Sequence, residues 1–69
     1  MNEKEHKRRI TQAVIAMAAT FRQESTEPML YGYWIGLRDL PVDAAEAAIL
    51  AAMKACRFMP TIAEIREQI

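Results

Sequence analysis

The sequence predicts a small all-α protein, a single domain over residues 1–69 made of four helices joined by short loops. Two observations support this fold class. Alanine, a strong helix former, occurs twelve times, and runs of the β-branched residues that favour strands are absent. Apolar residues recur at intervals of three and four positions, which places them on one face of a helix. A chain of 69 residues is long enough for one domain only.

The first predicted helix covers about residues 3–21. Its apolar stripe consists of Ile10, Val14, Met17 and Phe21, widened by the alanines at positions 13, 16 and 18. A polar connection follows, in which Ser25 and Thr26 are suitable N-cap residues and Pro28 suits a first helical turn. We therefore expect a second helix over about residues 27–38. Its inner face consists of Leu30, Trp34 and Leu37, with Met29 and Tyr33 beside them.

Prolines delimit the two remaining helices. Pro41 disfavours a helical conformation at the preceding residue, so the third helix is expected over about residues 42–56. Its inner face consists of Val42, Ala45, Ile49, Ala52 and Cys56, with Met53 adjacent. After a loop that ends at Pro60, Thr61 and Glu64 have the spacing of a capping box. The fourth helix is expected from Thr61 to at least Gln68, with the isoleucines at positions 62, 65 and 69 facing inward.

Small residues form two further patterns, one in the second predicted helix and one in the third. Gly32 and Gly36 both lie inside the second helix, where each costs roughly 1 kcal/mol relative to alanine. The third helix carries a stripe of alanines at positions 44, 48, 51 and 55. Close packing between helices of the domain is the first interpretation of these patterns, and a smooth surface for a partner helix is the second. Trp34, Tyr33 and Phe58 are expected in the core.

The number and position of the charged residues bear on whether the chain binds nucleic acid or a protein partner. Nine Lys/Arg residues balance nine Asp/Glu residues, which argues against a dedicated nucleic-acid-binding module. A basic cluster opens the first helix at positions 4, 7, 8 and 9; a solvated helix end explains it, and contact with nucleic acid or an acidic partner is the alternative. Tyr31, Ile35 and Arg38 share another face of the second helix. We select Tyr31, Ile35, Arg38, Lys7 and Arg8 as candidate partner-binding residues, because Tyr and Arg are enriched at interfaces.

Residues suited to catalysis do not form a recognisable set. The sequence has no glycine-rich phosphate loop, no metal-ligand cluster and no Ser/His/Asp arrangement. His6, the only histidine, lies in the polar N-terminal segment, and Cys56, the only cysteine, is expected to be a buried structural thiol. We therefore predict no enzyme, no catalytic residue, no cofactor, no metal and no small-molecule substrate. No apolar stretch approaches the ~18 residues of a membrane span, and no signal-peptide pattern opens the chain, so an intracellular protein is expected.

Several features occur in order along residues 29–69: Trp34 with Leu37, the turn at residues 39–41, the alanine-rich segment 42–56 and the Phe58-Met59-Pro60-Thr61-Ile62 entry to the last helix. Together they resemble the loader/inhibitor family of phage replicative helicases. The resemblance implies the N-terminal helical domain of a phage or prophage replication protein in the bacterial cytoplasm. Members of the family bind the hexameric replicative helicase, hold it inactive and deliver it to an origin marked by an origin-binding protein. A flexible tail after this domain carries much of their helicase contact, so residues 1–69 alone are not expected to suffice for loading.

A helix-turn-helix DNA-binding domain is the alternative function. Residues 42–56, the turn at 57–60 and the last helix could be interpreted in that way. Glu64 and Glu67 would then stand on the recognition helix, where they would repel phosphate. We therefore expect weak nucleic-acid binding or none, and a non-catalytic adaptor remains the first hypothesis.

Overall fold

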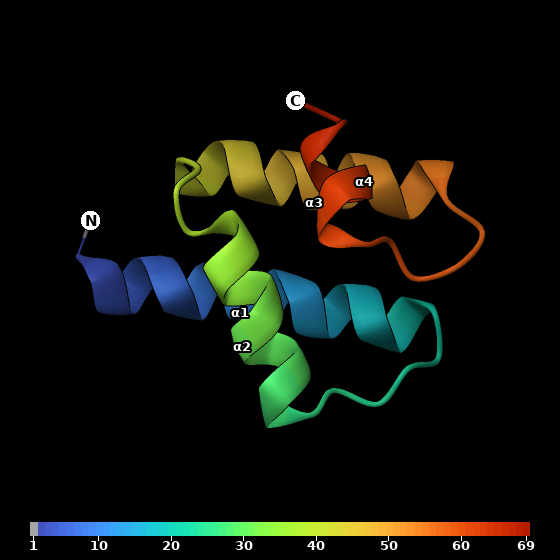
Figure 1. Ribbon diagram of the computed structural model, residues 1–69, viewed down its shortest axis with the longest axis horizontal. Helices are drawn as coiled ribbons and strands as arrows, with labels where there is room; N and C mark the ends of the chain where they lie inside the picture. The colour runs from blue at the N-terminus through green and yellow to red at the C-terminus, as the bar shows by residue number, and fades with distance from the viewer. Residues whose placement is uncertain (1) are drawn as a thin grey trace.

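The computed structural model describes residues 2–69, which form four α-helices and no strand (Figure 1). The helices are α1 (Glu3–Thr20), α2 (Glu27–Leu37), α3 (Val42–Ala55) and α4 (Ile62–Arg66). The all-α prediction is confirmed, and the first three helices end within one residue of the predicted positions. None of the described helices combines the length and the apolar character needed to cross a membrane.

The four helices form two layers. Figure 1 shows α1 and α3 side by side and running in the same direction, with α2 crossing α1 and α4 lying over α3. The most extensive contact is between α1 and α3, and α2 also contacts α4. Such parallel neighbours need a connection that returns the chain to its starting end. The segment that contains α2 makes this return.

Side chains near the helix starts satisfy free backbone N–H groups. Asn2 accepts a hydrogen bond from the amide of Glu5 at 2.8 Å, and Thr26 accepts one from the amide of Met29 at 3.3 Å. The predicted capping box is present at α4: the Thr61 hydroxyl accepts from the Glu64 amide at 3.2 Å, and the Glu64 carboxylate accepts from the Thr61 amide at 2.9 Å. The two threonine caps therefore start α2 and α4 where the sequence predicts.

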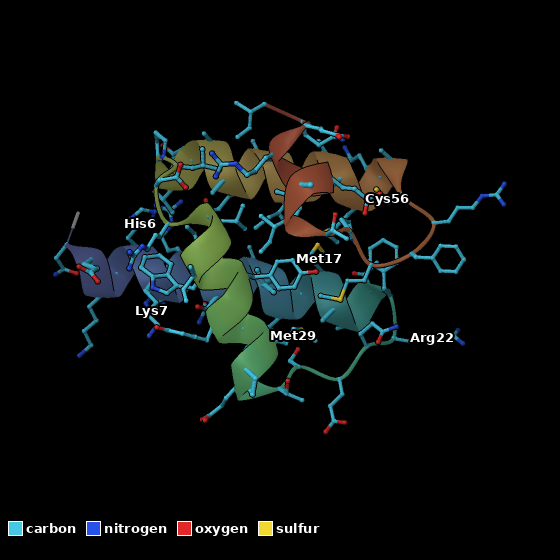
Figure 2. The ribbon with its side chains drawn as sticks, viewed as in Figure 1. His6, Lys7, Met17, Arg22, Met29 and Cys56 are labelled. Carbon is cyan, nitrogen blue, oxygen red and sulfur yellow. The ribbon has the colours of Figure 1, made fainter. Side chains whose placement is uncertain are left out.

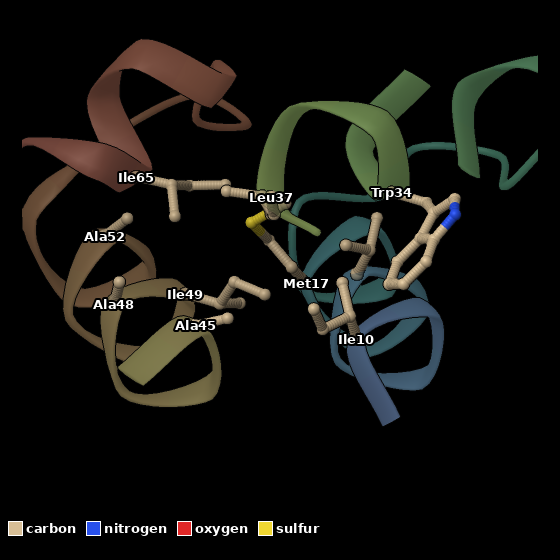
Figure 3. Packing of buried hydrophobic residues seen from close by; sticks show 10 residues of the cluster. Ile10, Met17, Trp34, Leu37, Ala45, Ala48, Ile49, Ala52 and Ile65 are labelled. Atoms are coloured by element: carbon tan, nitrogen blue, oxygen red, sulfur yellow. The ribbon is translucent and has the colours of Figure 1, made fainter. Parts of the chain in front are cut away.

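The core lies between the two layers and draws on all four helices (Figure 3). Its buried members are Ile10, Val14, Met17, Trp34, Leu37, Ala45, Ala48, Ile49, Ala52 and Ile65. Trp34 is only 4% exposed, which confirms its predicted place. The alanine stripe of α3 contributes Ala48 to this core, whereas Ala44 and Ala51 are half-buried and Ala55 is exposed. Packing inside the domain therefore explains only part of that stripe.

Two expectations about the C-terminal part are wrong. The α4 helix ends at Arg66, before Gln68, so Ile69 leaves the helical stripe and is exposed. Phe58, expected in the core, is 83% exposed. Met59 packs against the core and Pro60 is fully buried, so these two residues take the inward positions of the loop and Phe58 faces solvent. Ala16 of α1 is likewise exposed.

Candidate functional site

The outward face of α2 carries three of the predicted partner-binding residues. Tyr31 is 59% exposed, Ile35 is 47% exposed, and Arg38 follows at the next helical turn. Trp34 and Leu37 occupy the opposite, core-facing side of this helix. Because the core covers α2 on one side only, the other side exposes two large apolar groups and a cation together. We use the name α2 face for Tyr31, Gly32, Ile35 and Arg38.

Lys7 of α1 joins this face where the two helices cross. Its Nζ atom lies 6.0 Å from the centroid of the Tyr31 ring, within the range of a cation–π interaction. Figure 2 shows Lys7 on α1 beside α2. An open hollow of about 560 Å³ lies at this crossing, lined by Lys7, Thr11, Glu27, Pro28, Leu30 and Tyr31. The structure thus brings a predicted α1 residue and a predicted α2 residue into contact.

Arg8, the fifth predicted residue, is engaged elsewhere. Its guanidinium forms an ion pair with Glu5 one helical turn earlier, with an Nε–Oε2 hydrogen bond of 3.2 Å. Both side chains are exposed, so this pair contributes little to stability. Within residues 2–69, no hydrogen bond or ion pair joins Arg8 to the α2 face. The sequence-predicted set therefore divides into a cluster of four residues and one separate cation.

Ion pairs within the domain use several of its carboxylates. Arg9 of α1 pairs with Asp43 and Glu46 of α3, with hydrogen bonds of 3.3 Å to Asp43 Oδ1 and 3.1 Å to Glu46 Oε2. Arg66 donates to both carboxylate oxygens of Asp39 at 2.9 and 3.0 Å. Among the described residues, Lys7 and Arg38 make no such ion pair. Two cations without a direct ion pair therefore stand beside the exposed Tyr31 and Ile35, with Glu27 and Glu3 lining the adjacent hollows.

His6 is half-buried against Trp34, although it lies near the N-terminus. Its ring meets Trp34 edge-on, with centroids 5.3 Å apart and planes at 89°. The Nε2 atom is buried and has no hydrogen-bond partner among residues 2–69. Glu3, Arg38 and Asp39 line the hollow next to this pair. No residue spacing predicts this contact, because the crossing of α1 and α2 creates it.

Two other reactive side chains serve the structure. The Tyr33 hydroxyl donates a hydrogen bond to the carbonyl of Pro60, and burial raises the pKa of this phenol. The Cys56 thiol is half-buried and donates to the Glu64 carboxylate at 3.7 Å. Desolvation, and then the Glu64 charge, raise the pKa of Cys56 above its ordinary 9.0, so the thiolate is scarce at neutral pH. Within residues 2–69, no three His, Cys, Asp or Glu side chains gather as metal ligands.

Comparison with known proteins adds no family assignment. Neither the protein-family models, nor the curated proteins, nor the solved structures contain a match to this chain.

Proposed function

We propose that the chain is a non-catalytic adaptor in phage DNA replication, and that it binds the hexameric replicative helicase as a loader or inhibitor would. The observation that carries the protein-binding part is the α2 face with Lys7. Exposed Tyr and Arg side chains beside an exposed aliphatic residue are typical of interface hot spots. The helicase itself is proposed from the resemblance of residues 29–69, and an origin-binding protein is a second partner on the same ground.

Residues that carry the resemblance have structural roles compatible with this proposal. Trp34 anchors α2 to the core, so the opposite side of α2 is held outward. Pro60 accepts the Tyr33 hydrogen bond, and Thr61 caps α4. The motif at residues 58–62 therefore fixes α4 against α2 and stabilises the helix that presents the binding residues.

The helix-turn-helix alternative has less support. The α4 helix has five residues, shorter than the recognition helices that fill a major groove. Arg66, its one cation, already binds Asp39 and also donates to the carbonyl of Gly36 at 3.0 Å. Glu67, next to it, is exposed. A DNA phosphate approaching α4 would meet an engaged arginine and a free carboxylate.

The decisive experiment measures binding of the purified chain to a purified hexameric replicative helicase by isothermal titration calorimetry. Ile35→Ala should weaken binding, whereas Leu50→Ala should not, because Leu50 is a similarly exposed aliphatic residue (52%) on α3. Lys7→Glu should also weaken binding, with Lys54→Glu on α3 as its control. Absence of binding by the wild-type chain, alone and with a C-terminal extension from a family member, would refute the helicase proposal.

A further inference from the structure

Gly32 has no evident role in the packing of the domain. Glycine is a poor helix former, yet Gly32 lies in the middle of α2. A β carbon added at this position would meet no atom within 4 Å, and the backbone does not have a positive φ. Gly36 differs, because a β carbon there would lie 2.8 Å from Cγ2 of Ile62. Internal contacts therefore require glycine at position 36 and leave position 32 free to hold a larger residue.

The surroundings of Gly32 form an apolar trough. A hollow of about 270 Å³ lies over Gly32, between α2 and the start of α4. Its lining residues are Pro28, Met29, Gly32, Tyr33, Thr61 and Ile62. Tyr31 and Ile35 are adjacent on the helical surface and stand out from it. Because Gly32 has no side chain, the exposed surface of α2 is recessed at its middle. A partner's backbone could approach closely at this point.

Charge along the same surface indicates what would fill the trough. Lys7 and Arg38 both lie toward the α1 side of the α2 face, since Arg38 lines a hollow together with His6 of α1. Glu27 and Glu3 line the hollows beside these cations, but among the described residues neither cation forms an ion pair. Asp39, the acidic residue next to Arg38, is neutralised by Arg66. A segment lying along α2 would therefore gain by placing carboxylates on its α1 side. An apolar centre with a basic edge is complementary to an amphipathic helix that has one acidic edge.

We infer that the α2 face receives an α-helix of the partner protein, with small or apolar residues over Gly32 and carboxylates against Lys7 and Arg38. This inference rests on the proposed adaptor function and assigns its contact. Helices approach most closely where one of them lacks a side chain, so Gly32 is the point of closest approach. The arrangement explains why a residue that weakens the free helix occupies this position.

The test exploits opposite effects on stability and on binding. Gly32→Ala should raise the Tm of the free chain by about 4 °C, because alanine improves helix propensity without a clash. The same substitution should weaken the affinity for the purified replicative helicase roughly threefold, and Gly32→Leu should weaken it tenfold or more, because the side chain fills the trough. Ala47→Leu is the matched control, since it enlarges an exposed small residue on α3 and should leave affinity unchanged.

Charge reversal tests the acidic edge in the same titration. Arg38→Glu should weaken helicase binding, and the loss should shrink as salt is raised. If Gly32→Leu binds the helicase as tightly as the wild-type chain, the docking of a helix over Gly32 is wrong while the adaptor function stands. If the wild-type chain binds the helicase neither alone nor with a C-terminal extension from a family member, both the inference and the proposed function are overturned.

Discussion

Ile62 fills the space in which a side chain at Gly36 would begin. Its Cγ2 atom lies 2.8 Å from the position of a β carbon at residue 36, and its Cγ1 atom lies 3.0 Å away. Because isoleucine carries two γ carbons on Cβ, rotation about χ1 cannot clear both of these positions at once. This contact joins α2 to the start of α4, so both helices depend on the glycine.

Gly36→Ala should therefore destabilise the domain by about 1–3 kcal/mol, the usual cost of overpacking. The measurement is the midpoint of urea denaturation followed by circular dichroism. Gly36→Ala with Ile62→Val should recover part of the loss, since valine lacks the Cδ1 atom that also approaches position 36. A higher midpoint for Gly36→Ala alone would show that α4 does not pack on α2 in this way.

Thr61→Ala should lower stability by about 1 kcal/mol, because the amide of Glu64 loses its hydrogen-bond acceptor at the start of α4. Thr61→Ser keeps the hydroxyl and should retain most of the stability. The two variants are compared by thermal denaturation. Equal losses for both would mean that the threonine methyl group matters more than the cap.

Trp34→Ala should cost about 3–5 kcal/mol, a loss that can unfold so small a domain. The native tryptophan, 4% exposed, should emit at shorter wavelength than the unfolded chain and resist iodide quenching. Trp34→Phe, which keeps an aromatic ring, serves as the milder variant and should remain folded. Strong quenching of the native wild-type protein would contradict the buried position.

Acidification should lower the free energy of unfolding of the domain because Asp39 and Glu64 become protonated. Hydrogen bonds from Arg66 hold the pKa of Asp39 below its ordinary 3.8, and the Thr61 backbone amide holds the pKa of Glu64 below 4.5. Since both values are lower in the folded state, the stabilisation is present above the unfolded-state pKa and is lost as pH falls through the folded-state pKa. Between neutral pH and pH ~3, the Tm of the Asp39→Asn variant should therefore fall by less than the Tm of the wild-type chain. Parallel pH curves would rule out a contribution from the Asp39–Arg66 pair.

DNA binding should be weak, with a Kd no tighter than roughly 10⁻⁴ M at physiological salt. Arg9 and Arg66 are engaged in ion pairs with carboxylates of the domain, and Arg8 of α1 pairs with Glu5. Fluorescence anisotropy with labelled duplex and single-stranded DNA at low and high salt provides the measurement. Submicromolar, sequence-selective binding that persists at about 200 mM salt would favour the helix-turn-helix alternative.

Local signals in the sequence were sufficient to place the starts of the four helices. Pro41 and Pro60 interrupt the helical pattern. Thr26 is the N-cap of α2, and Thr61 is the N-cap of α4. The position of Phe58 could not be obtained in this way. In the loop after α3, tertiary packing decides which residue faces inward, and the core takes Met59 and Pro60. The end of α4 was also missed, because helical spacing continues to Ile69 although the helix does not.

The candidate site was predictable in part. Helical spacing correctly grouped Tyr31, Ile35 and Arg38, since these residues belong to one helix. The approach of Lys7 to Tyr31 depends on how α1 and α2 cross, and single-helix periodicity contains no information on that angle. Gly32 was recognised as unusual, but only the atoms around it distinguish an open glycine from one that a neighbour covers.

The parallel pairing of α1 with α3 has a consequence for how the domain folds. The ion pairs of Arg9 connect residues that are 34 and 37 positions apart, so the main interface closes a long segment of chain that includes α2. Closing such a segment lowers the conformational entropy of the chain before the contacts between α1 and α3 can form and offset this cost. Folding should therefore be slower than for a bundle in which antiparallel neighbours are adjacent in sequence. The parallel pairing also makes α2 part of the one cooperative unit, because α2 bridges the two ends of that closure and contacts both α1 and α4. A partner that binds the α2 face would thereby resist opening of the whole domain, and the partner-bound chain should unfold more slowly than the free chain.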